Sequence, residues 1–121
     1  MLTFPPSVRI WFATEPVDLR KGFDGLAAIV RNQWRRDLYG GHLFVFLGKR
    51  LDRCKILLYE RNGLAIYYRR LERGRFRIPG QLKGACPAEL DATALTMLLD
   101  GIDIGRVHRT KPWTPPIEKS A

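Results

Sequence analysis

Apolar and polar residues alternate near the start of the chain, over residues 8–13 (VRIWFA). This period of two is typical of a half-buried strand. One face would hold the apolar side chains Val8, Ile10 and Phe12. The other face would hold Arg9 and Trp11. The pattern predicts a first strand over these six residues.

The pattern changes to helical spacing over residues 18–36. A single apolar stripe follows positions i, i+3, i+4, i+7 and i+11, and it consists of Phe23, Leu26, Ala27, Val30 and Trp34. Asp18 is a candidate N-cap, and arginines crowd the far end, so the charges follow the helix dipole. We predict the main helix here, with its stripe packed on a sheet.

Strand-like runs return after Gly40 and Gly41. Residues 43–47 (LFVFL) are apolar on both faces, which predicts a central strand covered on one side by the helix and on the other by a further element or a partner. Residues 54–59 and 64–71 flank Asn62-Gly63, a strong signal for an antiparallel hairpin.

The end of the chain contains weaker signals. A short strand is predicted over residues 76–78, followed by a loop over residues 80–89. Asp91 can cap a helix over residues 92–100 that carries a small apolar face and ends at Gly101. That face consists of Leu95, Leu98 and Leu99.

Together these elements predict one α+β domain over residues 1–104. We expect an antiparallel sheet of about five strands, one main helix packed on it, and a second short C-terminal helix that closes an edge. Residues 105–121 are basic, contain prolines and lack periodicity, so we expect a mobile tail.

The charge of the chain is concentrated in its hairpins. The formal net charge is +9, and residues 49–77 alone carry ten Lys and Arg against three acids. Such a balance favours a polyanionic partner, nucleic acid first, over an inert basic surface.

Arginine-rich turns are the strongest candidate site. Guanidinium groups match phosphate geometry, and the neighbouring Tyr67 or Tyr68 could stack on an exposed base. The alternative is a solvated sheet edge that discourages aggregation, with one of the two tyrosines in the core. The candidate DNA-binding residues are Lys49, Arg50, Arg53, Arg69, Arg70, Arg73, Arg75 and Arg77.

A second candidate site, DLRKGFDG over residues 18–25, marks the start of the main helix. Arg20 and Lys21 could bind a phosphate at the helix N-terminus. We favour a structural role, in which Asp18 caps the helix, Phe23 packs, and the glycines allow the helix to lie close to the sheet.

Catalysis has little support in the sequence. No nucleophile is visibly paired with a base, and no phosphate-binding glycine motif is present, so we expect neither an enzyme nor a cofactor. Cys54 and Cys86 lack the spacing of a zinc site, and we expect no metal. Without a leader or a membrane-spanning run, the chain is expected in the cytoplasm.

Three segments carry a resemblance to a known family: VRIWFATEPVDLRKGFDGLAAIV, GHLFVFLGKRLDRCKILLYERNGLAIYYRRLERGRFRIP and LTMLLDGID. Over residues 3–104 the chain resembles the small accessory protein, of the TnpB or second open reading frame type, of the bacterial insertion-sequence family numbered sixty-six. The motifs are specific in combination.

The resemblance implies a role in transposition beside a separate, larger transposase that performs the catalysis. With the basic segment it favours a DNA-binding accessory protein that contacts transposon ends or target DNA, and self-association is compatible with it. A protein adaptor that docks the transposase without touching DNA is the alternative. A metal-dependent nuclease using Asp18, Asp24 or Asp52 is a third hypothesis, with the least support.

Overall fold

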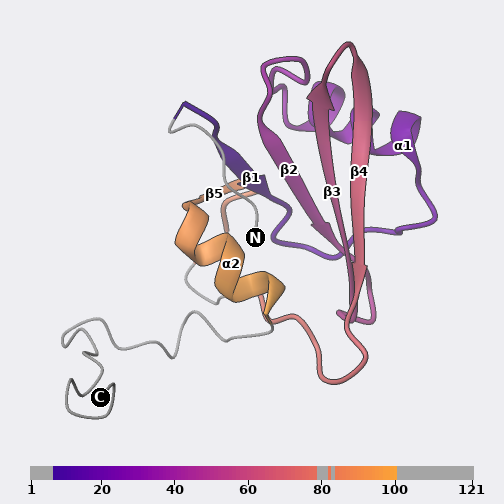
Figure 1. Cartoon of the computed structure of the whole chain (residues 1–121), viewed down its shortest axis with the longest axis vertical. Coiled ribbons are helices and arrows are strands. Elements are labelled where there is room, and N and C mark those ends of the chain that lie inside the picture. Colours follow the sequence, from indigo (N-terminus) through magenta and orange to yellow (C-terminus); the bar gives the residue numbers. More distant parts are fainter. Residues whose placement is uncertain (1–6, 79–81, 83, 101–121) are drawn as a thin grey trace, which may run out of the picture.

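A five-stranded sheet with the order β4-β3-β2-β1-β5 forms the centre of the fold (Figure 1). The computed structural model describes residues 7–78, 82 and 84–100. Its elements in chain order are β1 (Ile10–Phe12), α1 (Phe23–Ala28), the π-helix η1 (Ile29–Gln33), β2 (Leu43–Leu47), β3 (Arg53–Glu60), β4 (Gly63–Arg70), β5 (Ala88–Leu90) and α2 (Ala92–Leu99). The predicted α+β class, the five strands and the two helices are confirmed.

The sheet is mixed, whereas the sequence pattern predicted an antiparallel one. β1 and β2 are parallel, with Ile10 opposite Leu43, and the other three pairings are antiparallel. Parallel neighbours require a crossover connection of a dozen or more residues. The segment that contains α1 and η1 is that connection, so the main helix determines the direction of β2.

The fifth strand is β5, not the predicted strand over residues 76–78. Phe76 is fully buried, but its backbone N–H donates to the carbonyl of Leu51 in the β2–β3 turn rather than to a strand ladder. β5 lies within the predicted loop and pairs with β1, with Leu90 opposite Ile10. Its buried Ala88 and Leu90 alternate with an exposed Glu89, a signal too short to predict alone.

The β3–β4 hairpin forms as predicted, one residue out of register. Arg61 and Asn62 both have positive φ, 49° and 64°, as the two central residues of a type I′ turn do. Gly63 is therefore the first residue of β4 and pairs with Glu60.

The main helix is shorter than predicted and starts later. It begins at Phe23 with Gly22 as its N-cap, so Asp18 does not cap it. Phe23 is 49% exposed and was wrongly placed in the core. The rest of the stripe is buried, and Trp34 stacks on Phe46 of β2 with ring centroids 5.1 Å apart.

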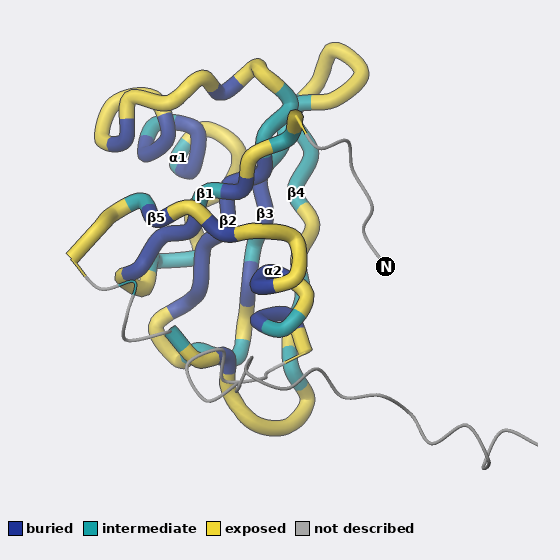
Figure 2. The backbone as a smooth tube through the Cα atoms, turned by 90° about the vertical axis from the view of Figure 1, so that its left-hand side faces the viewer, coloured by how far each residue is buried: buried dark blue, intermediate teal, exposed yellow. Residues whose placement is uncertain are grey.

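α2 covers the face of the sheet opposite α1 (Figure 2). The prediction that this helix closes an edge of the sheet is wrong, because its leucines pack on a face of the sheet. Asp91 caps it as predicted, since the Asp91 carboxylate accepts a hydrogen bond from the Ala94 N–H at 2.7 Å. The second face of β2 is thus covered within the chain, by α2 and Phe76, without a partner.

Alternate residues of β2 point into two separate apolar clusters. Phe44 and Phe46 pack with α1 and η1, while Leu43, Val45 and Leu47 pack with α2. No helix in the described part of the chain is long and apolar enough to cross a membrane. Gly101 and the expected tail at residues 105–121 lie outside the described residues.

Candidate nucleic-acid interface

The β2–β3 turn and the segment after β4 lie side by side at one end of the sheet, the lower end in Figure 1. The Leu71 N–H donates to the carbonyl of Asp52 at 2.8 Å, and the Phe76 N–H donates to that of Leu51. These bonds bring together the eight predicted DNA-binding residues, here called the basic end: Lys49, Arg50, Arg53, Arg69, Arg70, Arg73, Arg75 and Arg77.

The register of β3 and β4 distributes these side chains over both faces. Arg53 lies opposite Arg70, while Arg69 lies opposite Cys54, whose side chain is in the cluster with α2. Residues directly opposite each other share a face. Arg53 and Arg70 therefore project on the α1 side of the sheet and Arg69 on the α2 side.

The basic end is exposed and carries uncompensated charge. All eight residues except Arg69 are exposed, and their charge is opposed by only Asp52 and Glu72 in the same two stretches, which leaves a net +6. Among the described residues, Arg70 is the only one of the eight in an ion pair, with Glu72 at 2.9 Å. The hydrogen bond that Arg70 donates to the Glu72 carboxylate raises the pKa of the Arg70 guanidinium.

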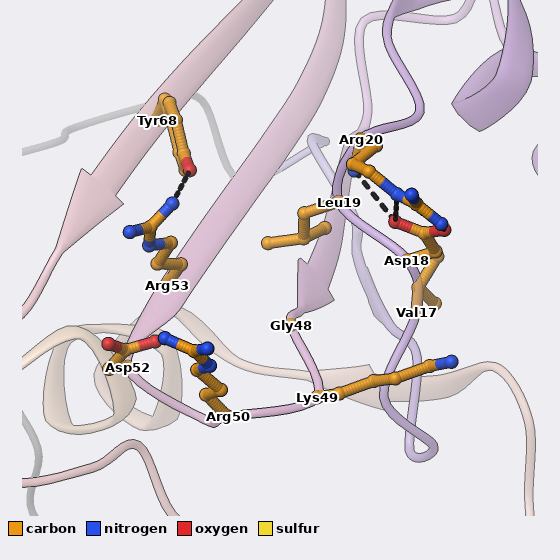
Figure 3. Close-up of a pocket in the computed structure, with 10 residues that line it drawn as sticks. All are labelled: Val17, Asp18, Leu19, Arg20, Gly48, Lys49, Arg50, Asp52, Arg53 and Tyr68. Carbon is orange, nitrogen blue, oxygen red and sulfur yellow. Dashed lines mark hydrogen bonds and ion pairs between the residues drawn. The ribbon is translucent and has the colours of Figure 1, made fainter.

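A hollow of about 530 Å³ opens on the α1 side of the basic end (Figure 3). Its apolar part comes from the segment before α1 and from the residue that follows β2. Its lining residues are Val17, Leu19 and Gly48, the cations Arg20, Lys49, Arg50 and Arg53, the acids Asp18 and Asp52, and Tyr68. The segment is held beside β2 because the Val17 N–H donates to the carbonyl of Leu47 at 2.8 Å.

Lys55 attaches the same segment to β3. Its ammonium group donates to the carbonyl oxygens of Leu19 and Lys21 at 2.7 and 3.1 Å, and it lies 5.0 Å from the centroid of the Tyr68 ring. Sequence reasoning missed this role, because a lysine at an alternating strand position resembles an ordinary solvent-facing residue.

Asp18 is bound by its neighbour Arg20. The carboxylate accepts hydrogen bonds from the Arg20 side chain at 2.7 Å and from the Arg20 backbone N–H at 3.0 Å. These bonds hold the pKa of Asp18 well below its usual range. Of the three acids considered for a nuclease, Asp18 and Asp52 line the hollow, while Asp24 lies in the first turn of α1.

Tyr67 and Tyr68 are both exposed, at 39% and 51%. The expectation that one of them enters the core is wrong, because β4 is an edge strand in which no residue is fully buried. Tyr67 lies opposite Ile56 on the α2 side and Tyr68 opposite Lys55 on the α1 side. Only Tyr68 lines the hollow, where its hydroxyl accepts a hydrogen bond from Arg53 at 3.3 Å.

A second group of cations and an aromatic ring lies near β1. The guanidinium groups of Arg36 and Arg9 lie 4.1 and 5.4 Å from the Trp11 ring centroid. The Arg9 side chain also pairs with Glu89 of β5 at 2.8 Å, and the Arg9 backbone N–H donates to Nδ1 of His42. These arginines are occupied by contacts within the chain, unlike most of the basic end.

Comparison with known proteins places the chain in a family. Residues 8–109 match the sequence model of the family described as IS66 Orf2 like protein. The chain is also similar to two uncharacterized proteins of Sinorhizobium fredii (strain NBRC 101917 / NGR234). It is 37% identical to y4jC over 109 residues, 90% of this chain and 91% of the relative. It is 35% identical to y4hO over 115 residues, 95% and 96% of the two chains.

No solved structure matches the chain. The family match covers most of its length, including the whole sheet and both helices. It agrees with the resemblance carried by the sequence motifs. The chain belongs to the IS66 Orf2-like family and is an accessory protein of an insertion sequence.

Proposed function

We propose that the chain is a non-catalytic, DNA-binding accessory protein that assists a separate transposase of the same element. The observation that supports this most is the convergence of two basic stretches, the β2–β3 turn and the segment after β4, on one exposed end of the sheet. Transposon ends or target DNA would be bound there through their phosphates.

The chemistry of the basic end suits a phosphate backbone. Most of its guanidinium groups have no carboxylate partner in the described part of the chain, so they can form charge-assisted hydrogen bonds to phosphate oxygens. If five to seven of these residues contact phosphates of duplex DNA, log affinity should fall against log salt with a slope of about −5 to −6.

Two double variants with the same change in charge test this proposal. Arg73→Gln/Arg75→Gln alters the basic end, whereas Arg31→Gln/Arg61→Gln alters exposed arginines on η1 and at the opposite end of the β3–β4 hairpin. Binding of labelled transposon-end DNA is measured by fluorescence anisotropy at several salt concentrations. We expect the first variant to reduce the salt slope by about 2 and the second to leave it unchanged.

Absence of DNA binding by the unaltered protein at low ionic strength would refute the proposal. Equal effects of the two variants would show that net charge matters and the basic end does not.

A protein adaptor is the second candidate, and the exposed edge of the sheet favours it. Within the part of the chain that the structure describes, β4 (Gly63–Arg70) has β3 as its only neighbour in the sheet, so its outer edge can accept a strand of another protein. Charge reversal to Glu at Arg69, Arg73, Arg75 and Arg77 separates the candidates. Loss of DNA binding would support the DNA-binding accessory protein. Unchanged DNA binding together with lost co-purification with the transposase would support the adaptor.

A further inference from the structure

We propose that the hollow beside the basic end binds one unpaired nucleotide of DNA, with its base against Tyr68 and Leu19 and its phosphate among Lys49, Arg50 and Arg53. This inference rests on the proposed DNA binding and specifies which form of DNA the protein prefers. The volume of about 530 Å³ lies within the range of roughly 300–1,000 Å³ typical of ligand pockets.

The hollow combines an apolar surface with a cationic rim, as a nucleotide requires. Leu19 projects between the pair Arg53–Tyr68 and the pair Asp18–Arg20 (Figure 3). Gly48 lies against it, since a Cβ atom on Gly48 would lie 3.2 Å from a methyl carbon of Leu19. A flat base can lie on this apolar surface, whereas an inorganic anion would gain nothing from it.

Tyr68 presents its ring to the hollow in a defined orientation. Its hydroxyl is held by Arg53 at 3.3 Å, and the Lys55 ammonium lies over the ring, yet half of the side chain stays exposed. Aromatic side chains on strands commonly stack on the bases of single-stranded nucleic acid. Both faces of a base within a duplex are already covered by its neighbours, so only an unpaired base can use this ring.

The charges of the hollow favour a phosphate over a cation. Arg20 and Asp18 neutralise each other in an ion pair at 2.7 Å. The remaining charged residues of the lining are Lys49, Arg50 and Arg53 against Asp52, a net charge of +2. Lys55 holds the wall formed by residues 19–21 in place, so the site exists before the ligand arrives.

The test compares a blunt DNA duplex with the same duplex carrying a short unpaired thymidine extension, by fluorescence anisotropy with the full-length protein. We expect the extension to tighten binding by roughly 5- to 150-fold, the range expected for one base stacked on an aromatic side chain. Equal affinity for the two DNAs would overturn the inference and leave the proposed DNA binding intact. Binding to neither DNA would overturn both.

Three tyrosine variants test whether Tyr68 is responsible for the preference for DNA with an unpaired extension. Tyr68→Leu removes the ring and should abolish the preference for the extension, while Tyr68→Phe keeps the ring and should retain it. Tyr67→Leu is the matched control, since this residue lies next in the same strand, is also exposed, and faces the α2 side. Retention of the preference by Tyr68→Leu, or its loss in Tyr67→Leu as well, would overturn the assignment of the base to Tyr68.

Discussion

The Lys55 ammonium donates a hydrogen bond of 2.7 Å to the carbonyl oxygen of Leu19, which joins β3 to the segment before α1. The same ammonium also binds the carbonyl of Lys21. One lysine thus satisfies two backbone acceptors in a stretch that belongs to no helix or strand. The hollow has a formed wall on this side because of these two bonds.

Removal of this ammonium should destabilise the protein. We expect Lys55→Met to lower the free energy of unfolding by about 1–3 kcal/mol, because two hydrogen bonds from a charged donor are lost. Lys49→Met, at an exposed turn position, is the control for loss of charge and should change it by about 0.5 kcal/mol at most. Urea denaturation followed by tryptophan fluorescence measures both, and equal effects would contradict the structural role of Lys55.

The cap of α2 should contribute measurably to stability. Asp91→Ala removes the acceptor for the Ala94 N–H and should cost about 0.5–2 kcal/mol of unfolding free energy. Asp91→Ser keeps an acceptor and should recover most of this loss. Thr93→Ala, at an exposed position in the same helix turn, serves as the control in thermal unfolding. An Asp91→Ala variant as stable as the unaltered protein would show that the cap is dispensable.

Phe23 and Trp34 should differ sharply in their effect on stability, although they share one helical stripe. Trp34 is buried on Phe46, so Trp34→Ala should cost about 3–5 kcal/mol. Phe23 is half exposed, so Phe23→Ala should cost about 1 kcal/mol or less. Chemical denaturation of the two variants measures the difference, and a large loss for Phe23→Ala would place that ring in the core after all.

The two cysteines should react with thiol reagents at very different rates. Burial raises the pKa of the Cys54 thiol to about 12, whereas Cys86 is exposed. The thiolate is the reactive form, and the ordinary pKa of 9.0 is recovered only on unfolding. We expect one cysteine to be alkylated rapidly in the native protein up to about pH 9, and both cysteines to be alkylated rapidly in denaturant. Mass spectrometry counts the alkylated cysteines.

The raised pKa of Cys54 also predicts how the stability of the protein changes with pH. Below pH 9 both states keep the Cys54 thiol protonated, and the contribution to stability is complete. Between about pH 9 and 12 the unfolded state loses the proton first, so this contribution falls as pH rises. Alkylation of Cys54 in the native state at neutral pH, as fast as Cys86, would contradict its burial.

Much of the fold could be predicted because local patterns were strong. The uninterrupted apolar run of β2 indicated a central strand, and the alternation around Phe12 indicated β1. Asp91 in front of a leucine-rich stretch indicated α2 and its cap. Two kinds of signal failed. The three residues of β5 were too few to show a pattern, and the helical stripe included Phe23, which lies at the exposed start of α1.

The candidate site was predicted only in part. Its cations were evident from composition, but their arrangement depends on contacts such as that between Phe76 and Leu51, which are far apart in the chain. Alternation along a strand already placed Tyr67 and Tyr68 on opposite faces, but which of them faces α1, and the part played by Leu19, could not be derived from sequence spacing alone. Each depends on where another segment of the chain packs.

The sequence by itself determined most of the element types, the charge and its concentration between residues 49 and 77, and the family. These are properties of local periodicity and composition, which need no knowledge of distant contacts. Tertiary structure decided the parallel pairing of β1 with β2, the covering of both sheet faces, and the hollow between Leu19 and Tyr68. Those features arise where segments remote in sequence bury apolar surface together, and periodicity within one segment does not specify its partner.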